Sequence, residues 1–205
     1  MAEERKDILR YALILFAITA VVAGLLAGVN LLTKETIAQN DVLAEQEALR
    51  EVMPEAASFE ALDAETAALY GVDAVYTAAA ADGAAQGYCV KVSENGYGGV
   101  IQAVVGVDAA GHVSGVSIIS HSETPGLGAN IEKDSFREQY TGQGAVEVVK
   151  AGAQEGEINA VSGATISSKA LTAGVNKAVE VASQLQGGAP PTPETPEGEE
   201  AGTDE

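Results

Sequence analysis

The chain opens with an uninterrupted apolar run. Residues 11–32 (YALILFAITAVVAGLLAGVNLL) carry no charge, and only Thr19 and Asn30 are clearly polar within the run. As an α-helix this stretch extends about 33 Å, enough to cross the hydrocarbon core of a bilayer. A cleaved signal peptide is the alternative, but its apolar region is usually about 7–15 residues long and ends at an Ala-x-Ala-like site, which is not evident here. We therefore predict a retained transmembrane helix at 11–32.

Basic residues flank this run unequally. Arg5, Lys6 and Arg10 precede it, whereas Lys34 alone lies just after it. Positive charge is retained on the cytoplasmic side of a membrane. The pattern predicts a cytoplasmic N-terminus at residues 1–10 and an extracytoplasmic location for everything after the helix.

The next segment has helical character. Residues 35–53 are rich in helix formers and are followed by Pro54, and an Ala-rich stretch then runs to about Tyr70. We predict a helical connector over 33–70. The apolar positions that support it are Ile37, Val42, Leu43, Leu49 and Val52.

Beyond residue 70 the apolar pattern changes to a period of two. Four runs rich in β-branched residues are separated by turn signals, notably Asn95-Gly96 and residues 108–111. This arrangement predicts an antiparallel meander, in which Cys89 is a buried small side chain. The runs are 72–79, 86–93, 99–107 and 112–121.

The last third of the chain predicts two helices and one more strand. Residues 134–140 favour a short helix, 145–150 a strand, and 166–185 an amphipathic helix that faces a core. The predicted fold class is α+β: a single N-terminal transmembrane helix, then an extracytoplasmic domain with a mainly antiparallel sheet and flanking helices. Residues 187–205 contain six acids, four prolines and no base, which predicts a disordered acidic tail.

Charge and composition exclude several functions. The chain has 30 acidic and 11 basic side chains, for a net charge of −19, so nucleic acid is not an expected partner. One cysteine excludes an intramolecular disulfide and every CxxC motif, and His112 and His121 are too few for a histidine metal cluster. Redox chemistry would therefore require an organic cofactor.

Small and hydroxyl-bearing residues lie where the last predicted helix begins. A helix start presents unpaired backbone N–H groups and a partial positive charge, which favour a bound phosphate. Gly163 and Ala164 let a ligand approach the backbone closely. The alternative is an ordinary helix cap without a ligand. The hydroxyl groups belong to Ser162, Thr165, Ser167 and Ser168.

A second segment follows the last strand of the meander. Pro125-Gly126 fits the central pair of a type II turn, and Gly128 leaves the backbone bare nearby. Leu127 could contact a flat ligand, with Glu123 and Thr124 as hydrogen-bonding groups. A plain surface turn is the alternative, since there is no strand–GxGxxG–helix unit to indicate a nucleotide site.

These segments resemble a known family. NAVSGATISSKAL at 159–171 resembles the flavinylation motif of the FMN-binding domain in the G subunit of Rnf ion-translocating oxidoreductase complexes, with the C subunit of the sodium-translocating NADH:quinone oxidoreductase as a sister case. HSETPGLGANIEKDSFREQYTGQ at 121–143 resembles the second block of the Rnf protein, and the similarity extends over roughly 5–186. Relatives often have Asp three residues before the motif serine, where this chain has Asn159.

The resemblance implies that Thr165 carries FMN through a phosphoester bond made by a separate FAD-dependent transferase. The FMN-binding domain would be residues 71–186. The surrounding motif residues would be Ser162, Gly163, Ala164, Ser167 and Ser168, and those near the isoalloxazine and ribityl chain Glu123, Thr124, Gly126, Leu127 and Gly128.

The implied function is electron transfer within a membrane complex. Covalent FMN would relay electrons between ferredoxin- and NAD-linked partner subunits, without a complete active site in this chain. The apolar run has no acidic, basic or histidine residue, so ion translocation is expected mainly in other membrane subunits. The alternatives are a free-standing membrane-tethered flavoprotein reductase and a non-redox extracytoplasmic binding module.

Overall fold

The structure is a computed structural model that describes residues 2–187, with side chains from residue 10 onward. The predicted acidic tail after Gly187 lies outside the described residues, as do the side chains of the predicted cytoplasmic segment before Arg10. The chain divides into two units at Ala44/Glu45, and each is considered by itself.

The N-terminal unit consists of most of α1, a continuous helix over Ala2–Val52. It is long and apolar enough to cross a membrane, and its most apolar stretch is not buried against any described residue. The polar Thr19 hydroxyl donates to the carbonyls of Leu15 and Phe16, each 3.0 Å away. Polar groups within a bilayer need such internal partners, so this helix is suited to the predicted span.

Residues 55–70 differ from the prediction of a helical connector. After Pro54 the chain forms strand β1 (Ser58–Ala61) and only then the short helix α2 (Ala64–Leu69). The helix predicted at β1 is wrong because this segment pairs antiparallel with β2, and tertiary pairing overrides a weak local propensity. Asp63 separates the two elements and caps α2, accepting the Thr66 amide at 2.8 Å.

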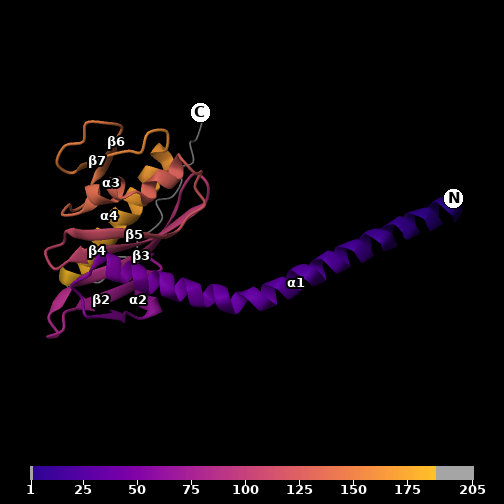
Figure 1. Cartoon of the computed structure of the whole chain (residues 1–205), viewed down its shortest axis with the longest axis horizontal. Helices are drawn as coiled ribbons and strands as arrows, with labels where there is room; N and C mark the ends of the chain where they lie inside the picture. Colours follow the sequence, from indigo (N-terminus) through magenta and orange to yellow (C-terminus); the bar gives the residue numbers. More distant parts are fainter. Residues whose placement is uncertain (1, 188–205) are drawn as a thin grey trace, which may run out of the picture. The chain divides into compact units, whose positions relative to one another are not determined.

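Five antiparallel strands form the main sheet in the order β1-β2-β3-β4-β5, which confirms the predicted meander (Figure 1). Asn95 pairs with Val100 where β3 turns into β4, and the Asp108 carboxylate accepts the amides of Ala110 and His112 in the next turn. The strands after β1 are β2 (Ala74–Ala79), β3 (Ala85–Asn95), β4 (Val100–Asp108) and β5 (Val113–Ser120).

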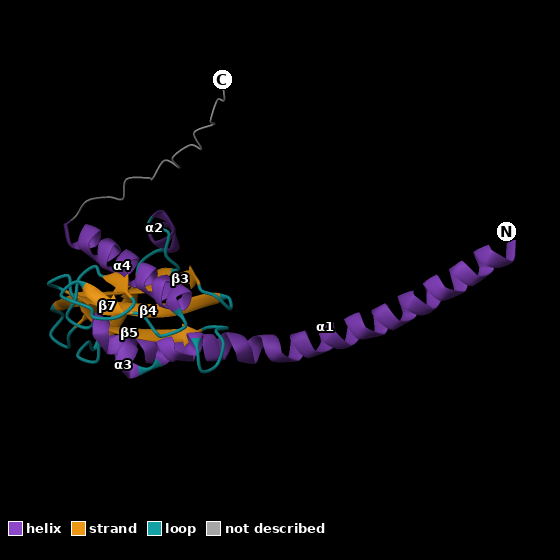
Figure 2. Ribbon diagram, turned by 90° about the horizontal axis from the view of Figure 1, so that it is seen from above, coloured by secondary structure: helices purple, strands orange, loops and turns teal. Residues whose placement is uncertain are grey.

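Helices cover both faces of this sheet. Helix α4 (Thr165–Gly187) packs against β3 and β4, while residues 45–52 at the end of α1 pack on the opposite face (Figure 2). Alternate residues of β4 therefore face different cores: Val105 belongs to the α4 side and Val104 to the α1 side. Cys89 is fully buried on the α1 side, as predicted, and burial raises the pKa of its thiol to about 12.

The end of α1 rests on two glycines that face each other across β4 and β5. Gly106 pairs with Gly115, and a Cβ on Gly106 would lie 2.8 Å from the Val52 carbonyl oxygen. The Ser114 hydroxyl donates to that carbonyl at 2.7 Å and so satisfies one of the free acceptors at the helix C-terminus. The close approach of helix and sheet depends on the missing side chains.

The segment between β5 and α4 is mostly short elements. Its helices confirm the one predicted at 134–140, and β6 lies within the strand predicted at 145–150. Strand β7 and its parallel pairing with β6 were not predicted. These elements are η1 (Gly128–Glu132), α3 (Asp134–Arg137), η2 (Glu138–Tyr140), β6 (Glu147–Val149) and β7 (Glu157–Asn159).

We expect Gly106→Ala to lower the free energy of unfolding by about 1–3 kcal/mol, because the added methyl group meets helix backbone that cannot move freely. The measurement is urea unfolding of the full chain in detergent. Gly144→Ala is the matched control, since Gly144 has open space around it and no positive φ. Equal stability of the two variants would contradict the close packing.

Candidate functional site

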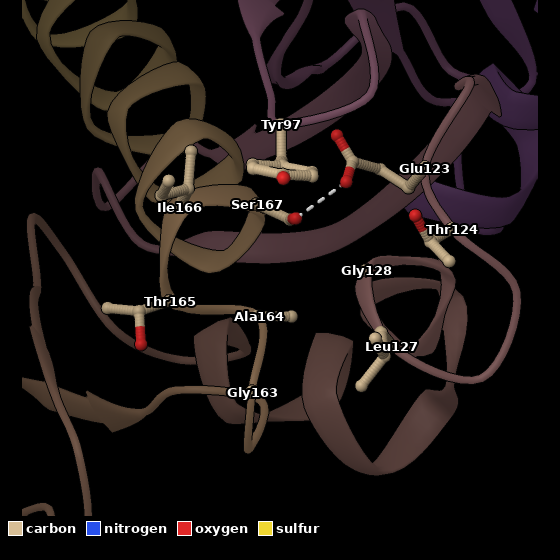
Figure 3. Close-up of a pocket in the computed structure, with 10 residues that line it drawn as sticks. All are labelled: Tyr97, Glu123, Thr124, Leu127, Gly128, Gly163, Ala164, Thr165, Ile166 and Ser167. Carbon is tan, nitrogen blue, oxygen red and sulfur yellow. Dashed lines mark hydrogen bonds between the residues drawn. The ribbon is translucent and has the colours of Figure 1, made fainter.

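The two segments singled out from the sequence meet at one cavity. Its volume is about 450 Å³, and it lies between the 123–128 loop and the start of α4 (Figure 3). A third segment, the tip of the β3–β4 hairpin, contributes Tyr97. The lining residues are Tyr97, Glu123, Thr124, Leu127, Gly128, Gly163, Ala164, Thr165, Ile166 and Ser167.

The start of α4 presents backbone donors to this cavity. The first helical bond runs from the Ser168 amide to the Ala164 carbonyl at 3.0 Å, after a turn in which Gly163 has φ +76°. Within the described part of the chain, no side-chain oxygen accepts from the amides of residues 165–167. The helix therefore begins without a side-chain cap, and these N–H groups can bind an anion.

Thr165 is the first residue of α4 and is half-buried at the edge of the cavity. In Figure 3 its side chain and that of Ile166 lie on the opposite side of the cavity from Thr124 and Leu127. The residue predicted as the attachment point thus begins the helix whose first amides have no side-chain acceptor among the described residues.

Three residues expected at the site do not line the cavity. Ser162 is exposed in the preceding turn. Ser168 is fully buried, where its hydroxyl donates to the Ala164 carbonyl and accepts the Val161 amide, both at 3.0 Å. Gly126 has φ +78° in the turn that the Leu127 amide closes on the Thr124 carbonyl, so its role is to shape the loop.

Glu123 is the buried charged group of the site. Its side chain is 5 % exposed, its Oε2 accepts the Ser167 hydroxyl at 2.7 Å and its Oε1 accepts the Gly98 amide at 3.0 Å. Burial alone would raise the pKa of this carboxyl group, but the bonds from Ser167 and from the amides of Gly98 and Tyr97 outweigh burial and lower the pKa. Glu123 is therefore held as a carboxylate.

Glycines make room for this carboxylate. A Cβ on Gly96 or on Gly128 would collide with a Glu123 carboxylate oxygen, and one on Gly98 would collide with the Ser122 carbonyl. A side chain at Gly96 or Gly128 would displace the Glu123 carboxylate, and one at Gly98 would displace the loop backbone. The neighbouring His121 fixes the loop from outside: its Nδ1 accepts the Glu123 amide at 3.0 Å, and its Nε2 lies 2.9 Å from Glu132.

Apolar side chains form the other walls, and sequence reasoning missed two of them. Tyr97 is 74 % exposed, Ile166 55 % and the expected Leu127 49 %. The signals were present in the sequence, since Tyr97 is an aromatic residue between glycines in a turn and Ile166 is an apolar residue in a polar first helical turn. The arrangement offers anion-binding amides at one edge and apolar contacts for a flat ligand at another.

Comparison with known proteins agrees with the two sequence blocks. Residues 1–52 match the model of the RnfG N-terminal region, and residues 96–180 match the model of the FMN-binding domain. The second match includes every residue that lines the cavity. The G subunit of the Na⁺-translocating ferredoxin:NAD⁺ oxidoreductase complex of Acetobacterium woodii is 39% identical over 196 residues, which cover 88% of this chain and 94% of that protein.

The chain belongs to the RnfG family, the G subunits of ion-translocating oxidoreductase complexes.

Other relatives agree with this RnfG assignment. The G subunit of the proton-translocating ferredoxin:NAD⁺ oxidoreductase complex of Clostridium ljungdahlii is 37% identical over 174 residues, which cover 83% of this chain and 90% of that one. The crystal structure of Shewanella oneidensis NqrC has a TM-score of 0.50 at 17% identity and covers 67% of this chain and 74% of its own. That similarity supports the α+β fold.

We expect Glu123→Gln to destabilise the protein by roughly 1–3 kcal/mol near pH 7. The amide nitrogen of Gln would replace one of the two carboxylate oxygens, and that oxygen's hydrogen-bond donor, the Gly98 amide or the Ser167 hydroxyl, would lose its acceptor. The lowered pKa of Glu123 stabilises the folded state above the carboxyl group's ordinary pKa of 4.5, and this stabilisation is lost as the pH falls through the lowered value. The variant should lack that part of the acid-induced loss.

Urea unfolding of the full-length protein across the acidic range measures both effects. Glu155→Gln is the control, because Glu155 is exposed. A variant with wild-type stability and an unchanged acid profile would show that the hydrogen bonds to Glu123 contribute little.

Proposed function

We propose that this protein carries FMN covalently in the cavity at the start of α4 and relays electrons within an ion-translocating ferredoxin:NAD⁺ oxidoreductase complex. The observation that supports this most is the convergence of the 123–128 loop and the first turn of α4 on one cavity, with Thr165 at its edge. Membership of the RnfG family and the match to the FMN-binding domain support the cofactor and the complex.

The residues present fit a flavin mononucleotide. The cavity of about 450 Å³ lies within the range of roughly 300–1,000 Å³ that small-molecule sites occupy. Its apolar walls suit a flat ring system, and the free amides of the first helical turn suit a phosphate. Gly128 and Gly163 leave backbone bare on two sides of the cavity.

Attachment would use the Thr165 hydroxyl. With FAD as donor, one P–O bond forms on Thr165 Oγ1, the pyrophosphate bond breaks, and AMP leaves while the hydroxyl proton is released. A separate FAD-dependent transferase is the expected catalyst, since this chain offers no second nucleotide site by its sequence motifs. The resulting phosphodiester carries one negative charge, which the helix N-terminus stabilises.

Asn159, at the position where relatives often have Asp, is compatible with this proposal. Asn159 ends β7, and its side-chain oxygen accepts the Ala153 amide at 3.1 Å. An amide oxygen serves that acceptor role as a carboxylate would, so the loop before the motif keeps its shape without the charge.

When bound, FMN supplies one- and two-electron transfer. The chain's own residues would hold the group: the amides of the first turn of α4 would bind its phosphate and Leu127 and Ile166 would cover apolar surface, while the Glu123 network keeps the loop and helix together. The protein would thus position the cofactor.

We further propose that the N-terminus is cytoplasmic and that the FMN-binding unit is extracytoplasmic. The basic residues before the apolar run support this orientation. Partner membrane subunits would carry out ion translocation, because residues 11–32 contain no acidic, basic or histidine side chain. The relatives are named for sodium in one complex and for protons in another, so the coupling ion is a property to measure.

We expect Thr165→Val to abolish flavin attachment. The full chain is produced in cells that contain the transferase, and intact mass spectrometry should show an increment of one FMN less one water in wild type and none in the variant. A fluorescent band on a denaturing gel gives the same information. Thr141→Val, the same change at an exposed threonine, should retain the full increment.

Three results would contradict the proposal in different ways. An increment that survives Thr165→Val places the attachment elsewhere, and an unmodified wild type favours a non-redox module. Turnover of soluble electron acceptors by the purified loaded protein favours a free-standing reductase.

A further inference from the structure

In the second unit of the chain, which begins at Glu45, exposed apolar side chains are concentrated at one place. Among its described residues, five large hydrophobic side chains are exposed, and three of these line the cavity at the start of α4. The three come from three different segments: the β3–β4 hairpin tip, the 123–128 loop and the first turn of α4. The five are Leu69, Tyr97, Val100, Leu127 and Ile166.

Tyr97 occupies a distinctive position among them. It is the one side chain larger than hydrogen in the hairpin tip Gly96–Gly99, which the Gly96 amide closes on the Gly99 carbonyl at 2.8 Å. The residue is 74 % exposed although it lines a cavity. An aromatic ring built into such a tip has the flat surface that a planar ligand can stack on.

Glu123 holds this tip in place. Its Oε1 accepts the Gly98 amide at 3.0 Å, and its Oε2 accepts the Ser167 hydroxyl at 2.7 Å. Both carboxylate oxygens are thus occupied by protein donors in a space walled by glycines. In Figure 3 the Tyr97 ring lies beside the Glu123–Ser167 pair.

We propose that Tyr97 is the aromatic wall on which the flavin ring lies, and that Glu123 is a positioning residue that acts on the ring only through the hairpin tip. This inference rests on the proposed function. It assigns the ring contact to a residue outside the two sequence motifs, and it gives Glu123 an indirect role in place of the direct contact that the family resemblance implied.

Flavin fluorescence tests the contact because a phenol or indole ring stacked on a flavin quenches its emission. Emission is measured per attached FMN in the loaded full chain, with loading taken from intact mass. We expect Tyr97→Ala to raise emission severalfold and Tyr97→Trp to keep it low. Leu69→Ala, which truncates an equally exposed side chain elsewhere, should leave emission unchanged.

A double-mutant cycle tests the indirect role of Glu123. Glu123→Gln should raise emission in the same direction as Tyr97→Ala, and the double variant should equal Tyr97→Ala alone, since both changes remove one contact. Direct contact between Glu123 and the ring would instead make the two effects add. If Glu123→Gln does not fold, Ser167→Ala carries the same comparison, because it removes one of the donors.

The outcomes separate this inference from the proposed attachment. Full loading with unchanged emission in Tyr97→Ala overturns the inference and leaves the attachment intact. If mass spectrometry finds no attached flavin, riboflavin is titrated against the unloaded full chain by fluorescence. Loss of roughly tenfold in riboflavin affinity in Tyr97→Ala then supports the aromatic wall, and equal behaviour of wild type and variant, including no binding by either, overturns it.

Discussion

The cavity depends on one buried carboxylate that joins three distant parts of the chain. Glu123 accepts hydrogen bonds from the tip of the β3–β4 hairpin and from Ser167 in α4 while its own backbone lies in the loop between them. A buried charge is strongly unfavourable unless donors surround it, so the carboxylate and its donors stabilise one another as a set. The glycines at positions 96 and 128 follow from this, because a Cβ on either would occupy the space of the carboxylate.

The sheet connects this site to the surface on which the end of α1 packs. The hairpin tip precedes Val100, the first residue of β4, whereas Gly106, against which Val52 packs, lies six residues beyond Val100. At about 3.4 Å per residue this separation is about 20 Å along the strand. Helix α4 and residues 45–52 at the end of α1 cover opposite faces of the same strands, so the cavity and the packing surface of α1 share one sheet.

Periodicity and turn chemistry were sufficient for the central strands because these are runs rich in β-branched residues that end at clear turn signals. They were insufficient for β1, whose four residues form a strand only because β2 pairs with them. Similarly, sequence patterns located the 123–128 loop and the first turn of α4 but not Tyr97. A Gly-flanked aromatic residue in a hairpin is typical of a turn, and only the folded chain places it beside Ser167. Ser168 was expected at the site, yet its hydroxyl bonds to its own helix, an alternative that a serine in a first helical turn always has.

The acidity of the chain bears on why a covalent link would suit this site. Without the six acids of the tail, the chain still has 24 acidic and 11 basic side chains, and such an acidic balance repels an anionic cofactor. A phosphate monoester carries about 1.5 to 2 negative charges near pH 7, whereas the proposed diester at Thr165 carries one. The helix amides then have less charge to balance, and the linkage replaces the binding energy that an acidic protein cannot supply by attraction. On this argument, permanent attachment and strong negative charge are compatible features of the same protein.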